Sequence, residues 1–212
     1  MINIGVTGQN GFVGTHLFNT LRLFPEKYRL IEFKRSYFED KVALDNFVSK
    51  CDVIVHLAAL NRHKIPSVIY DTNIGLVSLL VDSLNRTQST PHIIMSSSSQ
   101  EDNDNLYGKS KKVGRSLLSD WAKEKNAVFT GMIIPNVFGA FGQPYYNSVI
   151  ATFSYQLSNN ETPKIDIDGE LKLIYVVDLV ADIINCITDK RNETAYKIKH
   201  TSKTKVSELL EL

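Results

Sequence analysis

A glycine-rich segment directly after an apolar run is the feature that most constrains this chain. Gly8, Gly11 and Gly14 follow the stretch 2–7 at G-x-x-G-x-x-G spacing, and a helical pattern over 12–24 begins inside the segment. Glycines let such a turn close and let the backbone approach a pyrophosphate, while the helix N-terminus attracts the anion. The segment therefore predicts a dinucleotide-binding loop, with these cofactor contacts: Gly8, Asn10, Gly11, Phe12, Val13 and Gly14.

The rest of the chain alternates short apolar runs with longer helical patterns. Strands are predicted over 2–7, 29–34, 52–57, 92–97, 127–133, 171–176 and 196–199. Helices are predicted over 12–24, 42–50, 68–85, 106–125, 147–158 and 178–188, and another begins at 206–212. Such alternation predicts βαβ units. The fold class is thus α/β, a Rossmann-type doubly wound parallel sheet.

The domain organisation expected is a single domain over 1–212, because no repeat or linker-like stretch divides the chain. A dinucleotide-binding core is predicted over about 1–137. From about 138 to 212 turn-forming residues interrupt the alternation, which predicts a small C-terminal substrate-binding lobe. Only 16 residues, 36–51, separate Arg35 from the next strand, so the usual third strand of this fold is expected to be missing or vestigial.

Composition and charge exclude several classes of protein. The chain is 43% hydrophobic and 22% charged with a net charge of +1, so no broad field favours nucleic acid or an anionic membrane. No apolar stretch is long enough for a membrane helix, and the N-terminus does not resemble a signal peptide. Cys51 and Cys186 lie far apart without metal-ligand spacing, so no metal site is expected and a reducing cytoplasm fits.

The end of the second predicted strand indicates which dinucleotide is bound. An acidic residue there would bind the ribose 2′-hydroxyl of NAD, whereas basic residues can pair with the 2′-phosphate of NADP. The strand ends in Lys34 and Arg35, which predicts NADPH with Arg35 as the main contact. The alternative is that both are solvated surface cations.

A tyrosine and a lysine four residues apart suggest proton-transfer chemistry. Tyr107 and Lys111 share one face of a predicted helix, where the ammonium would lower the phenol pKa and make it a usable proton donor near neutrality. The fourth strand ends in the serine run 96–99, which could hold a substrate carbonyl beside Tyr107.

These motifs together resemble the extended, nucleotide-sugar-modifying type of the short-chain dehydrogenase/reductase superfamily. The supporting segments are the glycine loop, His56-Leu57-Ala58-Ala59, Asn73-Ile74-Gly75, the serine run, Tyr107 with Lys111, Pro135-Asn136-Val137-Phe138-Gly139 and Tyr175-Val176-Val177-Asp178. Within that superfamily the chain is most similar to the N-terminal reductase domain of the CapF or WbjC family of capsule enzymes, through 56–62, the short gap between Ser98 and Tyr107, and 146–153.

The resemblance implies an activity and a set of site residues. CapF-type reductase domains use NADPH to reduce a UDP-linked 4-keto-6-deoxy sugar in UDP-N-acetyl-L-fucosamine synthesis. By resemblance, Tyr107 donates the proton, Lys111 lowers its pKa and binds the nicotinamide ribose, and Ser98, or else Ser97, binds the C4 carbonyl. Further implied contacts are Leu57, Ala58 and Ala59 to the cofactor, and Asn136, Asn147 and Ser148 to the substrate.

Neighbouring residues have less direct roles. Asn73 is expected to brace the active-site backbone, and His56 to be packed and hydrogen-bonded rather than catalytic. Trp121 and residues 117–118 are expected in the core or at a subunit interface. By resemblance, the predicted helix 106–125 that carries them often forms part of a homodimer interface.

Departures from the family pattern leave alternatives open. No cupin domain follows within the 212 residues, so activity that needs that domain's metal is expected to be absent, and a separate cupin-type epimerase is a candidate partner. Leu171, followed by Lys172, stands where extended members often carry a diphosphate-binding Arg. One alternative is an epimerase or dehydratase that retains NAD; the dehydratase is disfavoured because Ser99 and Gln100 replace the usual acidic pair. The other alternative is a non-catalytic dinucleotide-binding protein.

Overall fold

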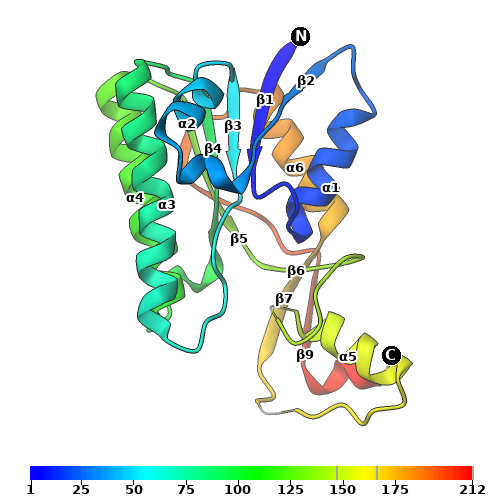
Figure 1. Ribbon diagram of the computed structural model, residues 1–212. Helices are drawn as coiled ribbons and strands as arrows, with labels where there is room; N and C mark the ends of the chain where they lie inside the picture. Colours follow the sequence, from blue (N-terminus) through cyan, green and yellow to red (C-terminus); the bar gives the residue numbers. More distant parts are fainter. Residues whose placement is uncertain (147, 166, 212) are drawn as a thin grey trace.

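A six-stranded parallel sheet forms the centre of the molecule (Figure 1). The computed structural model describes residues 1–146, 148–165 and 167–211. The strand order is β2-β1-β3-β4-β5-β8. The strands are β1 (Ile2–Thr7), β2 (Tyr28–Ile31), β3 (Val53–His56), β4 (His92–Ser98), β5 (Phe129–Ile134) and β8 (Glu193–Lys197). All five neighbouring pairs run parallel, and this confirms the Rossmann-type α/β prediction.

Helices cover both faces of this sheet (Figure 1). On one side lie α1 (Phe12–Arg22) and α6 (Val176–Thr188), and on the other lie α2 (Lys41–Val48), α3 (Pro66–Thr87) and α4 (Leu106–Lys125). Each side has its own apolar cluster, because the buried strands alternate their side chains between the two faces. Leu17 and Leu21 of α1 join the first cluster, and Leu80 and Leu84 of α3 join the second.

The expectation about the third strand is confirmed. Among the described residues, β2 is the edge of the sheet, and the 3-10 helix η1 (Arg35–Phe38) and α2 follow it. The second strand is shorter than the predicted 29–34. It ends early because Phe33 is buried against Phe38 and Phe47, which carries the backbone out of the sheet.

A second, smaller sheet forms a lobe beyond the carboxyl ends of the main strands (Figure 1). It consists of β6 (Asn136–Phe138), β7 (Glu170–Tyr175) and β9 (Ser202–Lys205), with α5 (Val149–Ser158) beside it. The strand expected at 171–176 belongs to this sheet. The helix expected from 206 is only the 3-10 turn η3 (Ser207–Leu210) within the described part.

The 138–212 range is thus shared between the two sheets. β8 pairs with β5 of the main sheet, and α6 buries Leu179, Ile183 and Ile187 in the main core. The lobe therefore contains less of the chain than the sequence pattern indicates. No helix in the described ranges has the length and apolar character needed to span a bilayer.

Candidate active site

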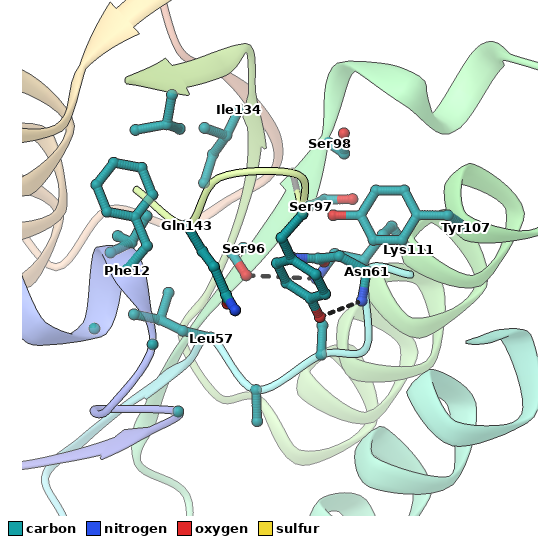
Figure 2. Close-up of a pocket in the computed structure, with 18 of the residues that line it drawn as sticks. Phe12, Leu57, Asn61, Ser96, Ser97, Ser98, Tyr107, Lys111, Ile134 and Gln143 are labelled. Atoms are coloured by element: carbon teal, nitrogen blue, oxygen red, sulfur yellow. Dashed lines mark hydrogen bonds between the residues drawn. The ribbon is translucent and has the colours of Figure 1, made fainter. Parts of the chain in front are cut away.

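A cavity of about 610 Å³ lies at the carboxyl ends of the main strands (Figure 2). Gly8 follows β1, Leu57 follows β3, Ser98 ends β4 and Ile134 ends β5, so the ends of these four neighbouring strands line the cavity. Open parallel sheets bind their ligands at this edge. The predicted residues that line the cavity are Gly8, Asn10, Gly11, Phe12, Val13, Gly14, Leu57, Ala58, Ala59, Ser97, Ser98, Tyr107, Lys111 and Asn136.

The glycine loop is shaped by close backbone contacts. Gly8 has a φ of +78°, which favours glycine, and a Cβ there would lie 2.9 Å from the amide nitrogen of Ala58. A Cβ on Gly14 would overlap the carbonyl oxygen of Gly8. The amide of Gly11 donates to that same carbonyl at 2.9 Å. Glycine at positions 8 and 14 is thus required by the fold of the loop.

The start of α1 fits the pyrophosphate of a dinucleotide. Gly11 is the N-cap and has no side chain that could accept from the first amides, and the first turn carries no acidic residue. The partial positive charge of the helix end therefore faces the cavity without a built-in counter-charge. Phe12, Val13 and Gly14 of this turn all line the cavity, so the residues present match the expected cofactor.

Lys34 and Arg35 lie outside the cavity lining, close to the end of β2. Gln9 of the glycine loop donates a side-chain hydrogen bond to the carbonyl of Phe33, which ties the loop to the residue before Lys34. Both cations are exposed, and Lys34 forms a 3.4 Å ion pair with Glu32. Their part in cofactor choice stays a prediction.

The start of α4 positions Tyr107. The side chain of Asn105 caps the helix by accepting from the amide of Gly108 at 2.7 Å. A Cβ on Gly108 would overlap the carbonyl oxygen of Gln100, so the glycine lets α4 approach the 3-10 helix η2 (Ser99–Asp102) closely. Tyr107 and Lys111 then face the cavity one turn apart (Figure 2).

The three serines at the end of β4, which Figure 2 labels, have different partners. The hydroxyl of Ser98 hydrogen-bonds the phenol of Tyr107 and accepts from the amide of Gln100 at 3.2 Å. Ser97 donates to the carboxylate of Glu101. The ammonium of Lys111 lies 3.4 Å from the hydroxyl of Ser96. Ser98 is therefore the serine bonded to the candidate proton donor, whereas the fallback, Ser97, is engaged elsewhere.

The prediction that Lys111 lowers the pKa of Tyr107 is wrong. Desolvation raises the pKa of Tyr107 to about 12, even though the Ser98 hydrogen bond lowers it. Burial also lowers the pKa of Lys111 to about 8, opposed by the charge of Glu101. The phenol is thus protonated at neutral pH, as a proton donor must be.

A buried ion pair behind the serines escaped the sequence analysis. Arg115 of α4 binds Glu101 through two hydrogen bonds of 2.7 and 2.6 Å, and donates at 2.8 Å to the carbonyl of Thr194 in β8. The pair joins η2, α4 and the edge strand. Its members are 14 residues apart, a spacing that signals nothing in sequence.

The three residues predicted to bind the substrate differ in their position relative to the cavity. Asn136 of β6 lines the cavity. The hydroxyl of Ser148 caps α5 by accepting from the amide of Ala151 at 3.3 Å, and Ser148 is outside the lining. Asn147 lies outside the described residues.

The two expected supporting roles are confirmed. The side chain of Asn73 accepts from the amide of Leu60 at 2.7 Å, donates to its carbonyl at 3.1 Å, and donates to Ser110. His56 is buried against the hydroxyl of Thr7 at 2.9 Å, and burial lowers the pKa of its imidazole to about 3. His56 is therefore a neutral core residue.

Lining residues from irregular segments were missed by the sequence analysis. Gln143 and Tyr146 reach the cavity from the segment before α5, and Arg62 reaches it from the loop after β3. The resemblance over 56–62 and 146–153 was the available signal for Arg62 and Tyr146, although no role was predicted for either, and neither segment includes Gln143.

The fold and the cavity define a short-chain dehydrogenase/reductase-type domain with a dinucleotide loop and a Ser-Tyr-Lys constellation. The family model described as "NAD dependent epimerase/dehydratase family" matches residues 4–198, and the chain belongs to that family.

Named relatives agree with this assignment. A UDP-2-acetamido-2,6-beta-L-arabino-hexul-4-ose reductase of Pseudomonas aeruginosa is 29% identical over 97% of this chain and 55% of its own. The capsular polysaccharide assembling protein CapF of Staphylococcus aureus is 33% identical, with a TM-score of 0.82 over 99% of this chain and 56% of its own. The chain thus spans just over half the length of these two relatives, and the resemblance to the CapF family is confirmed.

A more distant structure shares the fold. The protein RMD of Pseudomonas aeruginosa, solved with NADPH, has a TM-score of 0.86 over the whole chain and 80% of its own at 18% identity.

Proposed function

We propose that the protein is an NADPH-dependent reductase of a UDP-linked 4-keto-6-deoxy (N-acetyl)hexose, acting in the synthesis of UDP-N-acetyl-L-fucosamine for capsule or O-antigen. The observation that carries the proposal is that Ser98, Tyr107 and Lys111 line the same cavity as the glycine loop. The similarity to a UDP-sugar hexulose reductase supports the substrate class.

The chain's own residues supply positioning and a proton. The bound cofactor supplies a hydride to the sugar carbonyl. Ser98 and Tyr107 hydrogen-bond the carbonyl oxygen, and the protonated phenol donates its proton to the developing alkoxide. The buried cation of Lys111 stabilises negative charge on that side of the cavity.

NADPH, rather than NADH, is supported by Lys34 and Arg35 after β2. A homodimer is supported by an apolar surface on α3 and α4, where Leu79, Val113 and Leu117 are each more than a third exposed. We further propose cytoplasmic action and a separate cupin-type epimerase as partner. Cys51 and Cys186 are both free, which is consistent with a reducing compartment.

The assay follows NADPH oxidation in the presence of a panel of 4-keto UDP- and dTDP-sugars. A UDP-linked 4-keto-6-deoxy sugar should oxidise NADPH in a 1:1 ratio, and Tyr107→Phe should slow this by about 100-fold or more while NADPH still binds. Turnover without net oxidation would favour an epimerase or dehydratase that returns its hydride. Binding without turnover, unchanged in Tyr107→Phe, would favour a non-catalytic protein.

A further inference from the structure

The charges that face the cavity are all of one sign. Among the described lining residues, Arg62 and Lys111 carry charge and no carboxylate is present. Lys111 is buried beside the serines, whereas Arg62 is exposed on the loop after β3. An anionic ligand can therefore enter without meeting a like charge.

Hydrogen bonds hold the backbone that precedes Arg62 in place. The side chain of Asn73 accepts a hydrogen bond from the backbone amide of Leu60 and donates one to its carbonyl, two residues before the arginine. The guanidinium donates to the carbonyl of Tyr145 at 3.1 Å, and the amide of Asn61 donates to the hydroxyl of Tyr146 at 3.4 Å. The loop after β3 and the segment before α5 thus meet beside the cavity.

The chemistry of Arg62 suits a phosphate. A guanidinium has five N–H donors in a rigid fork, and the carbonyl of Tyr145 takes one of them. The remaining N–H donors can bind two oxygens of one phosphate at the same time.

Other cations of the lobe are less well placed. Lys172 and Lys203 face each other across the pairing of β7 with β9, and Lys203 binds Glu170 at 2.7 Å. Neither of them belongs to the cavity lining, and the same holds for Leu171. The lobe sheet therefore offers no substitute for Arg62 within the described cavity.

We propose that Arg62 binds the diphosphate of the nucleotide-sugar substrate and is a specificity-determining residue of the cavity. This inference rests on the proposed function. The start of α1 takes the pyrophosphate of the cofactor, and Arg62 takes that of the substrate. Loss of the guanidinium therefore weakens substrate binding and leaves cofactor binding unchanged.

The test is calorimetric titration of UDP into the protein saturated with NADP⁺. Arg62→Gln should raise the Kd for UDP about tenfold or more, and Arg62→Lys should give an intermediate rise, because an ammonium keeps the charge but not the fork. Uridine, which lacks the phosphates, should bind the protein and Arg62→Gln equally. Lys64→Gln is the matched control: Lys64 is an exposed cation of the same loop outside the cavity lining, and its removal should change nothing.

The outcomes separate this inference from the proposed function. If UDP binds the unmodified protein and Arg62→Gln equally well, the role of Arg62 is overturned and the proposed function stands. If Arg62→Gln loses NADP⁺ affinity to the same extent as UDP affinity, the inference fails, because the residue then acts on the fold or the cofactor. If the unmodified protein binds NADP⁺ but neither UDP nor uridine, the proposed function itself is overturned.

Discussion

The two walls of the cavity are built on different physical principles. The cofactor wall is backbone: Gly8 and Gly14 pack directly against carbonyl and amide groups, and a Cβ on either would meet them. The opposite wall is made of polar side chains at the end of β4 and on η2 and α4, held from behind by the buried pair of Glu101 and Arg115. One wall depends on the absence of side chains, and the other on charges that must stay paired.

The largest effect is expected from breaking the polar wall at Arg115. Arg115→Met leaves the carboxylate of Glu101 buried without its cation, and we expect the free energy of unfolding to fall by about 4 kcal/mol in urea titrations. Adding Glu101→Gln should restore much of that loss, because no unpaired charge remains.

Lys109→Met provides the matched control on the same helix. Lys109 pairs with Asp104 on the surface, and its loss should change the unfolding free energy by less than about 0.5 kcal/mol. Equal losses for Arg115→Met and Lys109→Met would contradict the view that this wall depends on a buried pair.

The backbone wall is broken by adding one methyl group. Gly14→Ala places a Cβ onto the carbonyl oxygen of Gly8, so the loop must shift, and the Kd for NADP⁺ should rise about 100-fold in fluorescence titrations. Gly75→Ala in α3 is the control, because a Cβ there has no heavy atom within 4 Å. It should leave binding unchanged and stabilise the helix by about 0.5–1 kcal/mol. Unchanged NADP⁺ affinity in Gly14→Ala would show that the loop tolerates side chains.

Lys111 sharpens the comparison because its charge is buried at a cost in stability, which we attribute to the role proposed for it in the reaction. Its pKa is lowered from 10.5 to about 8, so the folded protein carries an unfavourable cation at neutral pH. Lys111→Met should therefore raise the unfolding free energy by about 2 kcal/mol at pH 7 while reduction is lost. The folded state binds its proton more weakly than the unfolded chain does. The gain should thus be full below pH 8 and vanish as the pH rises to about 10.5. A gain that grows above pH 8 in denaturation curves would contradict this.

The smallest effect is expected at the rim of the backbone wall. Arg35→Ala should weaken NADPH binding about tenfold by removing a partner for the 2′-phosphate, without changing the affinity for NADH. Arg29→Ala removes an exposed cation from β2 and serves as the control. If Arg35→Ala and Arg29→Ala both bind NADPH like the unmodified protein, Arg35 is only a solvated surface cation.

The backbone wall could be predicted from sequence because its signals are local. Glycine spacing after an apolar strand fixes a turn. One local signal also reaches the polar wall, because a four-residue spacing places Tyr107 and Lys111 on one helix face. The absence of the third strand was predicted from the length of the 36–51 segment alone, because 16 residues leave no room for it.

The polar wall could be predicted only in part, because its supports depend on tertiary packing. Glu101 and Arg115 are paired by the approach of η2 to α4, and Arg62 reaches the cavity from an irregular loop. The direction of the Tyr107 pKa shift was predicted wrongly, because spacing shows the nearby amine but not the burial that desolvates the phenol. The hydroxyl of Ser148 caps α5, a role that the position of this serine directly before the helix could have suggested.

The most direct test of the account follows the hydride itself. The protein is incubated with NADPH that carries deuterium at the transferred position of nicotinamide C4 and with a UDP-linked 4-keto-6-deoxy-N-acetylhexose, and the product is analysed by mass spectrometry. Our account predicts one deuterium at sugar C4 for each NADPH oxidised, and almost none with Tyr107→Phe in the same time. A sugar product without deuterium, or equal labelling by Tyr107→Phe, would contradict it.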